Sequence, residues 1–138
     1  RPGTLNGIAG AQLEGLAAVD GEVCVPPPHL ADAGADVILL PAPGTVPGVT
    51  MEYIRELVSY AHSLGLLTLT AVGTSQEGAD QQTIRQIALM CKMTGTDMHH
   101  LGDAGYIGMA LPENIMAYSA AIKGIRHTYR RMARSINR

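Results

Sequence analysis

The 138-residue chain has the length of one domain and is nearly neutral, with ten Lys and Arg against twelve Asp and Glu. This balance gives no general case for nucleic-acid binding, and no apolar run reaches the roughly 18 residues of a membrane span. Without Phe or Trp the core must be aliphatic, and two Cys make no secreted disulfide framework, so we expect a cytoplasmic protein.

The first 34 residues have no clear pattern. The stretch LNGIAGAQLEGLAAV (5–19) fits either a weak helix or the remnant of a strand, and VPPPHLADAG (25–34) suggests a stiff connection into a short helix. The chain begins with Arg, from which we expect a processed or truncated piece. We therefore treat 1–34 as an irregular or partial βα segment and 35–138 as a domain of three βα units.

Three short apolar runs, at 35–45, 66–75 and 96–105, each end in glycine-rich sequence. Continuous apolarity predicts strands covered on both faces, as in parallel sheets. Helices are predicted after each run: from the N-cap Thr50 to Gly65, from Asp80 to Gly95, and from Pro112 through one long final helix. Cys91 falls on the apolar face of the second helix, which indicates a buried free thiol.

The strands start about 30 residues apart, which is the βαβ rhythm. The fold class is therefore α/β, and two architectures share the pattern. One is the C-terminal part of a TIM (β/α)8 barrel; the alternative is an open, three-layer parallel sheet.

Three segments carry a family resemblance: AGADVILLPAPGTVPGVT, TAVGTSQEGADQQTIRQIALMCKMTGTDMHHLGDAG and GMALPENIMAYSAAIKGIRHTYRRMARSINR. They resemble the C-terminal part of a bacterial family of largely uncharacterised TIM-barrel proteins labelled phosphoenolpyruvate phosphonomutase-like or haloacid dehalogenase-like. The resemblance covers about residues 33–138 and implies that the three strands are barrel strands six to eight. It further implies a lyase or isomerase of the phosphoenolpyruvate mutase type. Such enzymes use Mg²⁺, but its acidic ligands lie on earlier strands.

In both architectures, sites form at the carboxyl ends of the strands. The loops there combine glycines with helix N-termini, which suits the phosphate or carboxylate of a small metabolite. An alternative is that the glycines only form turns. The predicted anion-binding residues are Gly73, Thr74, Ser75, Gly102, Gly105 and Gly108.

The paired histidines of HHLGDAG lie on the third predicted strand. His99 and His100 must point to opposite faces, so they cannot jointly chelate one ion, and no metal site is predicted. We predict His100 as a catalytic acid or base, with Asp103 orienting it or contacting a substrate hydroxyl. The alternative is a hydrogen-bonded structural histidine. Glu77 is a further candidate carboxylate, for which an exposed loop position is the simpler interpretation.

The final helix carries a basic stripe of Arg126, Arg130 and Arg134. A solvated face, or a salt-bridged contact to a neighbouring helix or subunit, explains it better than nucleic-acid binding. Three functions stay open: an enzyme acting on a small anionic metabolite, a non-catalytic binding barrel, and a structural fragment. The fragment would work only after oligomerisation or with the missing barrel half. We expect a homo-oligomer with no membrane or nucleic-acid partner, because a short sheet leaves its edges open.

Overall fold

The computed structural model describes residues 8–10, 31–32, 34–73, 75–102 and 110–134. Its strands are all parallel and follow the order β1-β2-β3-β4, so each described strand pairs with the next one along the chain. The strands are β1 (Ile8–Gly10), β2 (Val37–Pro41), β3 (Leu67–Val72) and β4 (Met98–Leu101). The predicted α/β class is confirmed. The described strands form an open sheet, and barrel closure is not shown.

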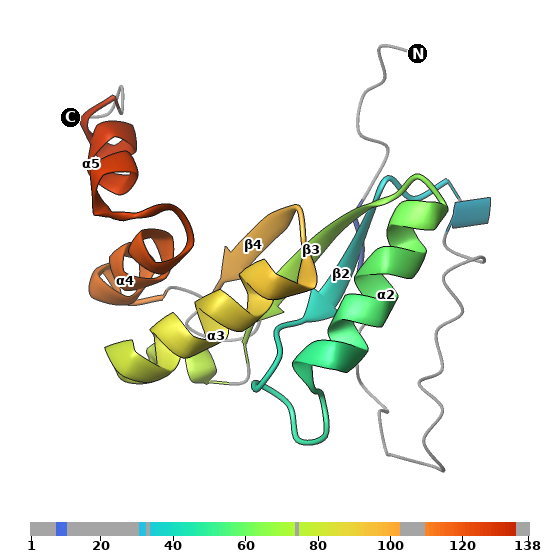
Figure 1. Cartoon of the computed structure of the whole chain (residues 1–138), viewed down its shortest axis with the longest axis horizontal. Helices are drawn as coiled ribbons and strands as arrows, with labels where there is room; N and C mark the ends of the chain where they lie inside the picture. Colours follow the sequence, from blue (N-terminus) through green and yellow to red (C-terminus); the bar gives the residue numbers. More distant parts are fainter. Residues whose placement is uncertain (1–7, 11–30, 33, 74, 103–109, 135–138) are drawn as a thin grey trace.

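Two helices connect successive strands and cover the same face of the sheet (Figure 1). Helix α2 (Met51–Ser63) begins where the Thr50 hydroxyl accepts the Tyr53 N–H at 3.2 Å. Helix α3 (Gln81–Thr94) begins after Asp80, whose carboxylate accepts the N–H groups of Gln82 and Thr83. Side-chain oxygens of this kind satisfy amides that have no partner inside the helix. The predicted N-caps are therefore confirmed.

The single long final helix was a wrong prediction. The chain instead forms α4 (Pro112–Lys123) and α5 (Ile125–Ala133), separated by Gly124 at φ 84° and ψ 154°. This backbone conformation is essentially restricted to glycine, so the helix cannot pass through it. The apolar periodicity nevertheless continues across the break. The hydroxyls of Ser119 and Thr128 lie 3.0 Å apart and join the two helices.

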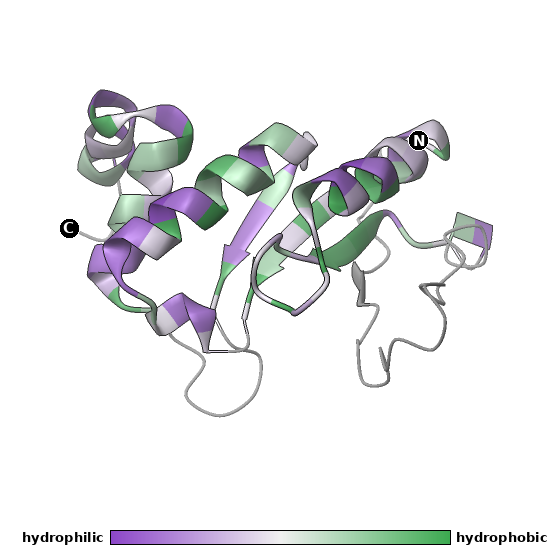
Figure 2. Cartoon of the chain, turned by 60° about the horizontal axis from the view of Figure 1, so that its bottom comes forward, coloured by the Kyte–Doolittle hydropathy of each residue, from purple (hydrophilic) through white to green (hydrophobic). Residues whose placement is uncertain are grey.

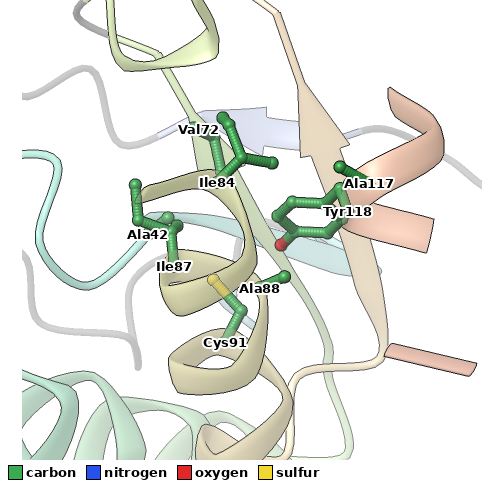
Figure 3. Packing of buried hydrophobic residues seen from close by; sticks show 8 residues of the cluster. All are labelled: Ala42, Val72, Ile84, Ile87, Ala88, Cys91, Ala117 and Tyr118. Atoms are coloured by element: carbon green, nitrogen blue, oxygen red, sulfur yellow. The ribbon is translucent and has the colours of Figure 1, made fainter. Parts of the chain in front are cut away.

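The core lies between the sheet and its helices, in two clusters. One gathers β2 and α2 side chains: Ile38, Leu40, Ile54, Val58, Ala61 and Leu66. The other joins β3, α3 and α4 (Figure 3): Ala42, Val72, Ile84, Ile87, Ala88, Cys91, Ala117 and Tyr118. Cys91 is a fully buried free thiol, as predicted. Burial raises the pKa of this thiol, which disfavours the reactive thiolate.

Side chains on the opposite face of the sheet belong to neither cluster. Leu39, Leu69 and Met98 alternate with the core residues of β2, β3 and β4 and remain partly exposed. Leu67, on the same face, is 44% exposed. The sheet therefore presents an apolar face that no described helix covers (Figure 1).

Within the N-terminal segment, the stretch predicted as helix or strand contributes β1, which pairs with β2 through Ile8↔Val37. Among the described residues, no helix is both long enough and apolar enough to cross a membrane.

Candidate functional site

Because the strands are parallel, their carboxyl ends lie together at the same end of the sheet. Val72 pairs with Leu101, so Gly73 and Gly102 leave the sheet side by side. The Gly102 N–H donates to the Val72 carbonyl at 3.1 Å. A Cβ atom on Gly73 would lie 3.7 Å from the Gly102 carbonyl oxygen. Two of the predicted anion-binding glycines thus adjoin each other, as the strand pattern required.

The loop after β3 turns sharply. Ser75 has φ 66°, the only described non-glycine residue in the left-handed region. A single 3₁₀ turn, η1 (Gln76–Gly78), follows it and leads to Asp80 at the start of α3. Such backbone conformations cost about 1–3 kcal/mol and persist only where surrounding contacts impose them. Ser75 itself is exposed at this edge. Thr74, Asp103, Gly105 and Gly108 lie outside the described residues.

Asn114, in the first turn of α4, forms hydrogen bonds to this loop. Its side chain is 2% exposed, and Nδ2 donates to the carbonyls of Glu77 at 2.9 Å and Ala79 at 2.8 Å. The contact ties the β3 loop to the N-terminus of α4, where no side chain forms a capping hydrogen bond. Sequence reasoning missed Asn114. No local pattern in the sequence marked it, because the partners of its side chain lie about 37 residues away in the chain.

Glu77 differs from its predicted exposed position. Its side chain is only partly exposed, and Oε2 is buried without a hydrogen-bond partner among the described residues. A buried carboxylate oxygen without a donor is costly, because the oxygen has lost its water. This oxygen belongs to the loop at the carboxyl ends of the strands but is closed to solvent.

The two histidines separate as strand geometry predicts. His99 faces the helices: its Nδ1 lies 3.0 Å from the Tyr118 hydroxyl, and the two rings meet edge to face. Burial, and then the charge of Lys123, lowers the pKa of His99 and favours its neutral form. His100 is exposed on the opposite face beside Ala71, its partner on β3. His99 thus matches the structural interpretation, whereas His100 stays available to a ligand.

The amino ends of the strands carry a different polar network. Asp97 Oδ2 lies 2.8 Å from His62 Nε2, and it accepts the Thr68 N–H at 2.8 Å and the Thr68 hydroxyl at 2.9 Å. These contacts tie α2, β3 and the start of β4 together, at the edge opposite the glycines. Asp97 therefore supports the fold rather than the candidate site.

A groove of about 600 Å³ runs beside β4 and α4, and sequence reasoning did not anticipate it. We name it the β4 groove; its lining is Leu69, Asp97, Met98, His99, Leu101, Ile115, Tyr118, Ser119, Ile122 and Lys123. Met98 and His99 point to opposite faces of the sheet. A groove that touches both must follow the outer edge of β4.

Comparison with known proteins adds a family match. The model of DUF7916, a domain of unknown function, matches residues 26–138. Its description names neither a phosphonomutase nor a haloacid dehalogenase. A search of curated proteins gives no match.

Proposed function

The chain belongs to the DUF7916 family, and from this premise we propose that it binds a small phosphorylated or carboxylated metabolite at the carboxyl ends of its strands. The carrying observation is the adjacency of Gly73 and Gly102 at the ends of β3 and β4. Without Cβ atoms, these glycines leave room for an anion to approach the main chain closely at this place, and the N-terminus of α4 adds a favourable dipole.

The proposed chemistry is that of a lyase or isomerase of the phosphoenolpyruvate mutase type, within a TIM barrel. His100 serves as the general acid or base, because it is exposed on the helix-free face one residue before the strand ends. Asp103 orients His100 or accepts a substrate hydroxyl.

Mg²⁺ enters only through the family resemblance. Among the described residues, no three side chains of His, Cys, Asp or Glu gather as a metal site would require. The donor set that the described residues offer at the carboxyl ends of the strands does not fit the ion, and we derive no step through it.

Amide NMR of the ¹⁵N-labelled chain tests the binding. We expect phosphoenolpyruvate, and more weakly inorganic phosphate, to shift the signals of Gly73, Ser75 and Gly102 saturably, while glycerol does not. Gly73→Ala should weaken binding by about fivefold or more, because the added methyl group narrows the space beside Gly102. Gly78→Ala is the matched control, since nothing lies within 4 Å of its Cβ position in the same loop.

Signals that do not saturate, or equal effects of the two alanine variants, would refute the binding proposal. The catalytic part has its own test. ¹H and ³¹P NMR monitor whether the wild-type chain converts a bound metabolite. For a metabolite that is converted, His100→Ala should abolish conversion while binding persists. Conversion at the wild-type rate would remove His100 from the mechanism.

A further inference from the structure

We propose that Tyr118 is a positioning residue of the candidate site. By holding His99, its hydroxyl fixes the carboxyl end of β4, where His100 and Gly102 lie. The positioning itself follows from contacts between described residues, whereas its effect on ligand binding rests on the function proposed above.

The four residues of β4, Met-His-His-Leu, do not by themselves specify which face meets the helices. Side chains alternate along a strand, so each face of β4 carries one histidine and one apolar residue. A slip by one residue would exchange the two faces without changing this composition. Burial of apolar area alone therefore does not decide which histidine faces the helices, and polar contacts have to make the choice.

Polar contacts hold both ends of β4. Just before its amino end, Asp97 accepts a main-chain N–H of β3 at 2.8 Å, at the end of the sheet opposite the glycines. Nearer the carboxyl end, His99 Nδ1 lies 3.0 Å from the Tyr118 hydroxyl, and the two rings meet edge to face with centroids 5.6 Å apart. His99 directly precedes His100 and lies three residues before Gly102. The Tyr118 contact therefore restrains the strand beside the candidate site.

Tyr118 is itself firmly placed, which a positioning residue requires. It is 5% exposed in the cluster of β3, α3 and α4, and Figure 3 shows its hydroxyl pointing from α4 toward Cys91. Burial, and then the neighbouring Cys91 thiol, raises the pKa of Tyr118, so the hydroxyl keeps its proton. One turn earlier, Asn114 ties α4 to the β3 loop, and in the last turn the Ile122 carbonyl accepts a hydrogen bond from Lys92 Nζ at 2.8 Å. Helix α4 is thus fixed on both sides of Tyr118.

The pair of Tyr118 and His99 is polar, although an apolar pair would be cheaper to bury, because both groups lose contacts with water. Their hydrogen bond recovers that cost only at a defined distance and direction, whereas apolar contacts tolerate sliding. A satisfied buried polar contact of this kind specifies one arrangement of the elements that it joins. The contact therefore favours one position of β4 against α4 over neighbouring positions.

One face of α4 holds both sides of the candidate site. Asn114 and Tyr118 lie four residues apart and are both buried, so they project from the same side of the helix. Asn114 bonds to the loop that follows Gly73, and Tyr118 holds the strand that precedes Gly102. Helix α4 therefore fixes these two segments relative to each other, which keeps Gly73 beside Gly102.

Hydrogen exchange of the ligand-free chain tests the positioning. In Tyr118→Phe, which keeps the ring and removes the hydroxyl, the Gly102 amide should exchange about fivefold faster, the factor that one net hydrogen bond is worth. Tyr129→Phe is the matched control, because Tyr129 is 52% exposed on α5. Val58→Ala is the control for lost stability, because Val58 is buried in the other cluster. Neither control should speed exchange at Gly102.

A double-mutant cycle tests whether Tyr118 acts through His99. In a His99→Ala background, Tyr118→Phe should not speed exchange at Gly102 any further. Unchanged exchange in Tyr118→Phe, equal acceleration in Val58→Ala, or additive effects in the cycle would overturn the proposal. If Tyr118→Phe loses its helical circular dichroism, His99→Ala alone supplies the test from the other end of the bond and should speed exchange at Gly102.

Ligand binding gives a separate readout. The dissociation constant of phosphoenolpyruvate, followed by the amide shift of Gly73, should rise about fivefold in Tyr118→Phe and no further when Tyr118→Phe is added to His99→Ala. Equal weakening by Tyr118→Phe in both backgrounds would refute an action through His99. If the wild-type chain does not bind phosphoenolpyruvate, the proposed function fails, while the exchange rate of Gly102 still decides the positioning by Tyr118.

Discussion

Replacing Asn114 tests how the loop after β3 is held. Asn114→Ala removes the two hydrogen bonds that Nδ2 donates to the carbonyls of Glu77 and Ala79. Each bond is worth about 1 kcal/mol net, and a buried carbonyl left without a donor costs about 1–3 kcal/mol. Since water entering the vacated space recovers part of that cost, we expect a total loss of about 2–4 kcal/mol of unfolding free energy.

Urea denaturation of wild type and variant at one fixed protein concentration measures this loss. Glu113→Ala is the control, because the neighbouring Glu113 is exposed, and it should change stability by less than about 0.5 kcal/mol. Hydrogen exchange gives the local readout. The amides of Gly78 and Ala79, which bond within the turn, should exchange faster in Asn114→Ala. A stability change no larger than that of the control would refute the clamp by Asn114.

Three further perturbations have defined outcomes. Partial burial alone would raise the pKa of Asp97, but hydrogen bonds from His62 and Thr68 outweigh it and hold the pKa below 3.8. Asp97 therefore stabilises the fold above about pH 3.8 and loses that effect as pH falls through the lower folded pKa. On acidification, the urea midpoint of Asp97→Asn should fall less than that of the wild type. The pKa of His99 is held below 6.5, so its contribution to stability is present above pH 6.5 and is lost as pH falls through the folded pKa. In His99→Gln, the unfolding free energy should therefore depend less on pH just below pH 6.5 than in the wild type. An unchanged pH dependence would contradict this. Gly124→Ala should cost about 1–3 kcal/mol in the same denaturation assay, because its φ of 84° strains a Cβ atom.

Much of the fold was predictable because its signals are local. N-caps at Thr50 and Asp80, and glycines at Gly65 and Gly95, act on the residues beside them. Gly124 shows the limit of such reasoning. The glycine was itself a possible stop signal, like Gly65 and Gly95, but the helical apolar period that runs across it favoured one continuous helix over the observed α4 and α5.

The location of the candidate site was predictable from the sequence, but its side-chain contacts were not. Parallel strands ending in glycine fixed the edge where Gly73 and Gly102 meet. The buried oxygen of Glu77 and the clamp by Asn114 depend on α4 packing beside the β3 loop, about 37 residues apart in sequence. No local pattern reports that contact. The β4 groove was not predicted for the same reason, since it lies between elements that only the tertiary fold brings together.

The paired histidines connect the fold to the proposed function. Their alternation made it certain that one histidine would face the helices, but only the register with β3 decides that it is His99. His100 then lies on the face opposite the helices, and Figure 2 shows the middle of β4, which the two histidines form, as a hydrophilic segment between apolar ends. His99 is held by the Tyr118 hydroxyl, whereas the exposed imidazole of His100 is open to a ligand that binds at the carboxyl ends of the strands. The alternation of the strand therefore assigns the structural role to one histidine and leaves the other for the proposed chemistry.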